Sequence, residues 1–119
     1  MDDASRRLRA TLIGLREQAA VRLESTSEML AALLGERAGS HDDDEHDPDG
    51  ATLSSEWSRL TGLADAARAK LQQVEHAIAR LDAGTYGVCA GCGQPIPAER
   101  LETRPFAEHC VPCAQRPAR

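Results

Sequence analysis

An unbroken apolar heptad pattern in the second half of the chain is the strongest constraint on its fold. Between Leu53 and Leu81 the steps from one apolar residue to the next alternate between four and three. The positions are Leu53, Trp57, Leu60, Ala64, Ala67, Leu71, Val74, Ile78 and Leu81. This spacing is typical of a coiled-coil seam, in which a helix buries a continuous apolar face against another helix. Polar residues around Leu53 and Gly84 just beyond Leu81 predict the two ends of this helix.

The first part of the chain has a matching but looser stripe. Its members are Leu8, Leu12, Leu15, Ala19, Arg22, Thr26, Met29 and Leu33, with Val21, Leu23 and Leu30 beside them. We expect a helix from about Ser5 to about Gly35, because this stretch contains no proline. Two long helices with complementary faces predict a mainly α fold, with an antiparallel coiled-coil hairpin in a monomer. A parallel homodimer is the rival, but the connector would interrupt its seam, and pairing within one chain has the lower ordering cost.

The negative charge of the chain is concentrated in the connector between these helices. The formal net charge is −5, whereas the segment 41–51 alone holds six carboxylates and no lysine or arginine. They belong to Asp42, Asp43, Asp44, Glu45, Asp47 and Asp49. A near-neutral remainder with 3% aromatic residues argues against binding to duplex DNA or stacking on single strands. The segment is a solvated loop, a weak divalent-cation site or a tip that presents carboxylates to a partner.

Four cysteines form two C-x2-C pairs, Cys89 with Cys92 and Cys110 with Cys113. Two such pairs with seventeen residues between them are typical of a four-thiolate zinc site. Because four thiolates close the tetrahedral shell, we predict one structural zinc ion bound by all four. A redox role for one cysteine pair would leave the other pair unused. His109 precedes Cys110, and we expect it to lie in solvent or beside the ligands instead of binding the metal. The surrounding segment has few large apolar side chains and is expected to need its metal to fold.

Neither a targeting segment nor a catalytic pattern is recognisable. The longest apolar run, Met29–Leu34, is far shorter than a membrane span, and the first residues lack the apolar core of a signal peptide. We therefore expect a cytoplasmic protein without membrane contact. In the reducing cytoplasm, cysteines are more often metal ligands than disulfide partners. The pattern contains no nucleophile–base pair, phosphate-binding loop or open metal site, so the protein is not expected to be an enzyme.

Three stretches in the C-terminal third carry a family resemblance. They are Gly84-Thr-Tyr-Gly-Val-Cys-Ala-Gly-Cys-Gly-Gln-Pro-Ile96, Arg100-Leu-Glu-Thr-Arg-Pro105 and Cys110-Val-Pro-Cys113. Together with the long helical hairpin, they resemble the bacterial DksA/TraR family of C4-type zinc-finger proteins. The motif of the zinc module is specific, whereas the coiled coil alone would not be. The resemblance covers most of the chain, from the first helix to the last cysteine.

The resemblance implies a transcription regulator that binds RNA polymerase directly, without sequence-specific binding to DNA. In the family the hairpin enters the secondary channel, and its acidic tip approaches the catalytic centre to modulate initiation, often together with guanosine tetraphosphate. The family tip motif is D-x-x-D-x-A. Here Asp49 and Ala51 match its second half, His46 stands at the first aspartate position, and Asp47 is the candidate replacement. The resemblance also places Arg104 near the alarmone-binding surface, and a salt bridge between module and hairpin is its alternative role.

The sequence therefore predicts two parts: a hairpin over residues 1–85 with an acidic tip at 41–51, and a C4 zinc-finger module over 86–119. We expect guanosine tetraphosphate to act weakly, because Ala114 and Gln115 stand where the family has basic residues. A zinc-ribbon nucleic-acid binder is the alternative function, although four arginines against three acids in the module argue against it. The third possibility is a structural protein whose coiled coil spaces two zinc modules.

Overall fold

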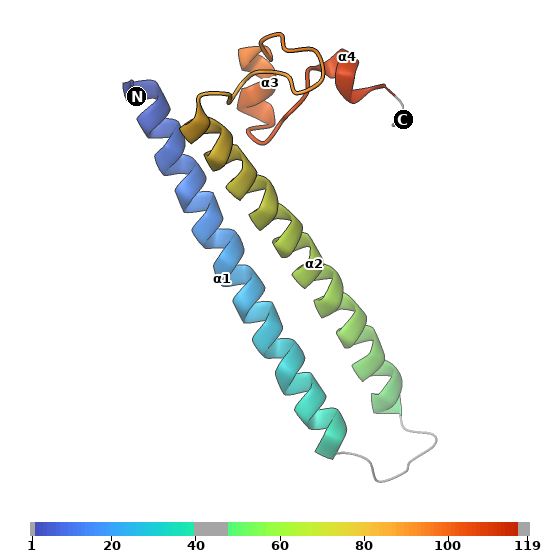
Figure 1. Ribbon diagram of the computed structural model, residues 1–119. Coiled ribbons are helices and arrows are strands. Elements are labelled where there is room, and N and C mark those ends of the chain that lie inside the picture. Colours follow the sequence, from blue (N-terminus) through green and yellow to red (C-terminus); the bar gives the residue numbers. More distant parts are fainter. Residues whose placement is uncertain (1, 40–47, 117–119) are drawn as a thin grey trace. The chain divides into compact units, whose positions relative to one another are not determined.

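A computed structural model of the chain describes residues 2–39 and 48–116, and their side chains over 2–36 and 52–116. Its elements are α1 (Asp3–Gly39), α2 (Pro48–Ala83), α3 (Ala98–Thr103) and α4 (Val111–Ala114) (Figure 1). Between 2–39 and 48–116 there is no strand, only an isolated antiparallel bridge between Val88 and Pro95. No helix within these ranges combines the length and hydropathy needed to cross a bilayer. The predicted mainly α fold is confirmed.

Two compact units make up the chain, and each contains a piece of both long helices. One comprises the described residues of Met1–Gly14 and Gln72–Arg119, and the other comprises those of Leu15–Leu71. The beginning of α1, the end of α2 and the cysteine-containing segment therefore belong to one unit. The boundary at residue 85 stays a prediction, because this grouping reflects packing and does not test which part folds alone.

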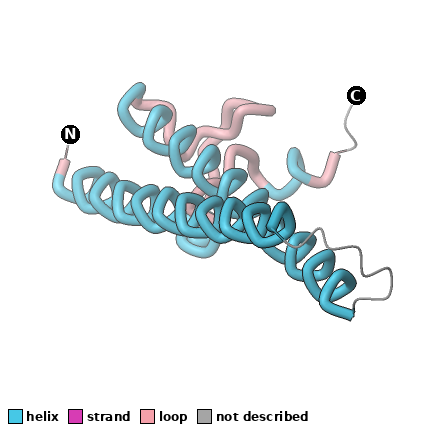
Figure 2. The backbone as a smooth tube through the Cα atoms, turned by 90° about the horizontal axis from the view of Figure 1, so that it is seen from below, coloured by secondary structure: helices cyan, strands magenta, loops and turns pink. Residues whose placement is uncertain are grey.

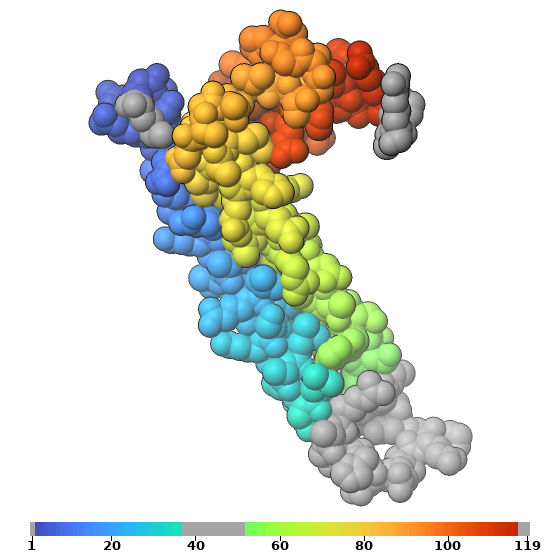
Figure 3. All heavy atoms as spheres, in the orientation of Figure 1, coloured from blue at the N-terminus to red at the C-terminus, as the bar shows by residue number. Residues whose placement is uncertain are grey.

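In the unit Leu15–Leu71, α1 and α2 lie side by side and run in opposite directions (Figures 1 and 2). Ala19 and Thr26 of α1 are buried, and so are Leu60, Ala64 and Ala67 of α2. Ala19 and Thr26 are seven residues apart, and the spacings from Leu60 to Ala64 and Ala67 are four and three residues. These spacings place the buried residues on one face of each helix. Figure 3 shows the atoms of the two helices in contact along this unit. The predicted antiparallel coiled-coil hairpin is confirmed.

The other unit has its own small core where the helices continue. Leu12 of α1 and Val74 and Ala77 of α2 are fully buried, and Ile78 is nearly so. Each of the nine predicted seam positions of α2 is buried or half-buried, which confirms the heptad pattern. An exposed ion pair ties the two helices here, with Nε of Arg9 2.9 Å from Oδ1 of Asp82. Because both side chains remain well exposed, this pair fixes the register more than it adds stability.

The buried face of α1 differs from the predicted stripe at two positions. Arg22 and Met29 were expected to face α2, but both are exposed. Leu23 and Leu30, which were expected beside the stripe, are half-buried instead. A straight helix has 3.6 residues per turn, so a strict 3.5-residue repeat drifts around its surface. After Ala19, Leu23 and Leu30 therefore take the places expected of Arg22 and Met29, while Thr26 and Leu33 keep their predicted places on the buried face.

Both long helices begin before the predicted residues, and α1 also ends later than predicted, at Gly39. Helix α1 begins at Asp3 because the Oδ1 atom of Asp2 accepts a hydrogen bond from the backbone N–H of Ser5 at 2.8 Å. This hydrogen bond lowers the pKa of Asp2. Helix α2 begins at Pro48 instead of near residue 52, since proline suits the first turn, where its missing N–H has no intrahelical partner. The last four residues of the expected connector, 48–51, are thus helical in their backbone.

The end of α2 follows the prediction. Gly84 has φ 80°, a left-handed conformation that favours glycine after a helix. The backbone N–H groups of Thr85 and Tyr86 then donate to the carbonyl oxygen of Arg80, at 2.8 Å and 3.1 Å. These bonds satisfy a carbonyl that the helix leaves open, and they turn the chain from α2 into the cysteine-containing segment.

Candidate metal centre

The first cysteine pair lies on a tight turn that follows α2. The backbone N–H of Cys89 donates to the carbonyl oxygen of Gln94 at 2.8 Å, and that of Gly93 returns to the carbonyl of Cys89 at 2.9 Å. The turn is closed by its own backbone, so Cys92 returns to the same side as Cys89. Ile96, which follows the turn, is buried, and its backbone N–H donates to the carbonyl oxygen of Gly87 at 2.7 Å.

The second pair lies at the start of helix α4. Cys110 is the residue before its first turn, with an extended backbone, and Pro112 occupies the first turn of the helix. The backbone N–H of Ala114 donates to the carbonyl of Cys110 at 2.9 Å, which closes the turn. Cys113 is thereby brought back toward Cys110 by the same two-residue spacing as in the first pair.

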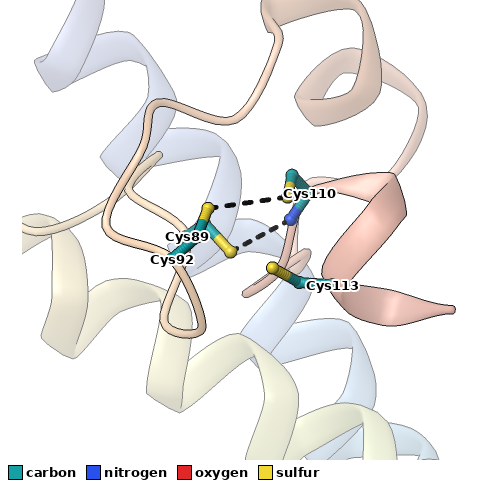
Figure 4. Close-up of side chains that lie close together, drawn as sticks. All are labelled: Cys89, Cys92, Cys110 and Cys113. Carbon is teal, nitrogen blue, oxygen red and sulfur yellow. Dashed lines mark hydrogen bonds between the residues drawn. The ribbon is translucent and has the colours of Figure 1, made fainter. Parts of the chain in front are cut away.

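Hydrogen bonds between the two turns bring all four sulfurs together (Figure 4). The N–H of Ala90 donates to the carbonyl of Glu108 at 2.8 Å, and the N–H of Cys110 donates to Sγ of Cys89 at 3.3 Å. The four Sγ atoms lie within 4.8 Å of one another. In the described part of the chain, this is the one group of three or more potential metal-ligating side chains placed so closely.

The cluster fits a tetrahedral zinc ion. Four sulfurs at about 2.3 Å from zinc would be about 3.8 Å apart, and the Sγ atoms of Cys92 and Cys110 are separated by 3.8 Å. All four thiols are free, and they range from buried Cys89 to exposed Cys92. A zinc ion bound by them would cross-link the two turns and keep no open position for a substrate, as in structural sites.

The electrostatics of the cluster also suit a cation. The hydrogen bond from the N–H of Cys110 lowers the pKa of Cys89 to about 5, so this sulfur is readily a thiolate. The hydrogen bonds of its neutral thiol with Cys110 and Cys89 raise the pKa of Cys113 to about 12. Ionising all four sulfurs in so small a volume is unfavourable without a positive charge. Metal binding supplies that charge and displaces the remaining protons.

Gly91, between the first two cysteines, is required by the close approach of the second pair. A Cβ atom at this position would lie 3.1 Å from Sγ and 3.3 Å from Cβ of Cys113. We expect Gly91→Ala to weaken zinc binding by about tenfold, because a ligand sulfur must move to relieve the contact. Competition with a chromophoric chelator measures the change. Gly14→Ala is the control, since nothing lies within 4 Å of its Cβ, and an equal affinity of both variants would contradict the steric role.

The remaining predicted site residues lie apart from this cluster. His109 is not among the clustered ligands, and its carbonyl accepts a hydrogen bond from Nε of Arg100 at 2.8 Å. The side chain of Arg104 is exposed and forms no ion pair within residues 2–36 and 52–116. Asp47 lies outside the described residues. The backbone of Asp49 and Ala51 belongs to the first turns of α2, and their side chains lie outside the described part.

Two long-range contacts of the module, one of them with α2, were not predicted from the sequence. Arg80 forms an ion pair with Glu108, with NH1 2.5 Å from Oε1. The hydroxyl of Tyr86 donates to the carbonyl of Pro105 at 2.9 Å, and burial raises the pKa of this tyrosine. The partners are 28 and 19 residues apart, so no local periodicity indicates them. The arginine that joins helix and module is thus Arg80, whereas the sequence analysis considers this role as the alternative one for Arg104.

The fold and the site together define a class: a helical hairpin whose second helix leads into a four-cysteine metal module. Residues 84–117 match the family described as prokaryotic dksA/traR C4-type zinc finger. The RNA polymerase-binding transcription factor DksA of Haemophilus influenzae is 35% identical over 65 residues, which are 55% of this chain and 45% of that protein. General stress protein 16O of Bacillus subtilis is 38% identical over 68 residues, or 57% and 42% of the two chains.

A solved structure extends the likeness over nearly the whole chain. Transcription factor DksA2 from Pseudomonas aeruginosa matches with a TM-score of 0.76 at 27% identity, covering 97% of this chain and 84% of that one. Residues 84–117 thus carry the zinc finger described for the dksA/traR proteins, and the fold of the chain is similar to that of DksA2. The segments that match the two curated relatives span less than half of those proteins' lengths.

Proposed function

We propose that this protein is a transcription regulator that binds RNA polymerase directly and acts through the secondary channel. Relatives that are 35% and 37% identical over 65 residues are named RNA polymerase-binding transcription factors in Haemophilus influenzae and Caulobacter vibrioides. The single observation that carries the proposal is the match to DksA2, because it includes the hairpin as well as the module. A match to the module alone would support zinc binding and leave the hairpin without a role.

The hairpin supplies the element that such a regulator needs to reach a buried catalytic centre. Its two helices have 37 and 36 residues, each about 55 Å long at 1.5 Å per residue. The acidic segment lies between them in the sequence. In this proposal Asp47, Asp49 and Ala51 face the polymerase active site, where carboxylates can interact with a bound metal ion or basic groups. The interaction of a carboxylate with a metal ion or a basic group is electrostatic, so it needs no defined pocket on this chain.

The other parts of the proposal concern cofactor, effector and assembly. One structural zinc ion holds the module, and the protein acts in the cytoplasm as a monomer, without catalysis of its own. The exposed side chain of Arg104 is available to an anionic effector, and we propose that guanosine tetraphosphate acts weakly through it. Sequence-specific contact with DNA is not part of this mechanism, because the module carries almost no excess positive charge.

Binding to purified RNA polymerase tests the proposal. We expect immobilised zinc-loaded protein to retain core polymerase, and another factor that occupies the secondary channel to displace it. A factor that binds elsewhere on the polymerase serves as the control competitor and should leave the complex intact. Absence of binding would contradict the proposed partner. Binding that resists the channel competitor would contradict the proposed docking site. Salt-dependent retention of duplex DNA without polymerase would favour the nucleic-acid-binding alternative.

A further inference from the structure

Arg80 occupies the junction between α2 and the metal module. It lies in the last turn of α2, and its backbone carbonyl accepts the hydrogen bonds that end the helix. Its guanidinium points the other way, into the module: NH1 donates to Oε1 of Glu108 and NH2 to the carbonyl of Phe106 at 3.4 Å. The arginine side chain is only 18% exposed, and its Nε atom is buried. One residue thus contacts both the helix end and the segment before Cys110.

Glu108 continues this connection to the sulfurs. Its carboxylate binds Arg80, while its carbonyl accepts the N–H of Ala90, which lies between the two cysteines of the first turn. Two residues further on, the N–H of Cys110 donates to Sγ of Cys89. The segment 106–110 is therefore held on one side by α2 and on the other by the first cysteine turn. Displacement of Glu108 would move the two cysteine pairs relative to one another.

We propose that the Arg80–Glu108 ion pair couples metal binding in the module to the folding of the last turn of α2. Arg80 is a positioning residue: it touches no sulfur, but it fixes the backbone that carries Cys110 and Cys113. This inference rests on the assignment of the four cysteines as metal ligands. It goes beyond the proposed binding to polymerase and does not depend on it. Because coupling between two equilibria is reciprocal, metal binding should in turn stabilise the helix end that Arg80 closes.

Loss of the ion pair has two measurable consequences. In Arg80→Met the aliphatic stem is kept and both hydrogen bonds into the module are lost, so the segment 106–110 loses this tie to α2 and keeps its hydrogen bonds within the module. We expect the zinc affinity to fall about tenfold, because the free energy that a hydrogen bond to a charged group contributes corresponds to a change in affinity of about this size. In the wild type, zinc should slow hydrogen exchange at the amides of Thr85 and Tyr86, which bond to the Arg80 carbonyl. In Arg80→Met this zinc-dependent protection should largely disappear.

The chain offers a matched control on the same helix. Arg68 also forms an ion pair, with Oδ1 of Asp65 at 3.1 Å, but both side chains are more than half exposed and the pair stays within α2. Arg68→Met should therefore leave zinc affinity and exchange unchanged. Glu108→Gln and the double variant Arg80→Met/Glu108→Gln complete a cycle. If the pair acts as one unit, the double variant loses hardly more affinity than the worse single variant.

Zinc affinity is measured by competition with the chelator 4-(2-pyridylazo)resorcinol, and the helical content of every variant is checked by circular dichroism. Wild-type protein that fails to bind zinc would overturn the assignment of the metal site itself. Zinc binding by the wild type, with equal affinities for Arg80→Met and Arg68→Met, would overturn the coupling alone. Additive losses in the cycle would also contradict it, because independent contributions mean that the ion pair is not the connection. Failure to bind polymerase would affect neither result.

Discussion

Removal of zinc is expected to abolish the tertiary structure of residues 86–116 while leaving most of α1 and α2 helical. Within these residues only Cys89 and Ile96 are buried apolar side chains, and the two helices have six and four residues. So little buried apolar surface cannot offset the conformational entropy of ordering the segment. Binding of zinc to four-ligand peptides contributes about 10–16 kcal/mol near neutral pH, which is comparable to the whole stability of a small domain.

Amide NMR spectra recorded before and after treatment with a chelator measure this effect. The signals from Tyr86 onward should collapse into the narrow range of unfolded chains, while the signals of α1 and of α2 before its last turn keep their positions. Addition of zinc should restore the dispersed signals, and addition of magnesium should not, because magnesium prefers oxygen ligands. Unchanged dispersion of the Tyr86 region in the metal-free protein would contradict a metal-dependent module.

The double variant Asp49→Asn/Ala51→Thr is expected to abolish the effect of the protein on transcription in vitro while binding to polymerase remains measurable. Asn keeps the shape of the aspartate but removes its charge, so an electrostatic interaction with a metal ion or a basic group is lost. Threonine adds bulk beside it. The rest of the hairpin and the module is unchanged by the two substitutions. This prediction rests on the proposed entry of the tip into the secondary channel.

A run-off transcription assay at several promoters, with binding measured in parallel, tests the tip. The matched control is Asp65→Asn/Ala69→Thr, which makes the same substitutions at exposed positions of α2 away from the tip. The control should behave as the wild type in both measurements. Equal transcription activity of the tip variant and the wild type would exclude the tip mechanism. Loss of binding in the tip variant would show that these residues dock the protein instead of acting near the catalytic centre.

The coiled coil could be predicted because its information is local and repeated. The seam of α2 is defined by an uninterrupted pattern from Leu53 to Leu81, and every position is buried or half-buried. The stripe of α1 is wider, because Val21, Leu23 and Leu30 lie beside it, and Leu23 and Leu30 replace Arg22 and Met29 on the buried face. A widened stripe does not specify which of two adjacent residues faces the partner helix. That choice is made by packing against α2.

The cysteine cluster was also predictable, but the contacts that hold it in place were not. The two-residue spacing within each pair is a local property, and it brings the sulfurs of one turn together in any surroundings. The pairing of Arg80 with Glu108 depends on how the chain turns after Gly84, and nothing in the pattern distinguishes Arg80 from the other arginines. The sequence offers Arg104 as a candidate for the salt bridge between module and hairpin, whereas the side chain of Arg104 is exposed in the structure.

Site-specific photo-crosslinking tests the central proposal, direct binding in the secondary channel, most directly. A photoreactive benzoylphenylalanine replaces Ser55, an exposed residue near the start of α2, and the zinc-loaded protein is irradiated with purified polymerase. The same substitution at the exposed residue Glu99 of α3 reports on the module. We predict that residue 55 crosslinks to polymerase segments that line the secondary channel, while residue 99 crosslinks to its outer rim or not at all. Crosslinks from residue 55 only to surfaces remote from the channel, or no crosslinks at either position, would contradict the account.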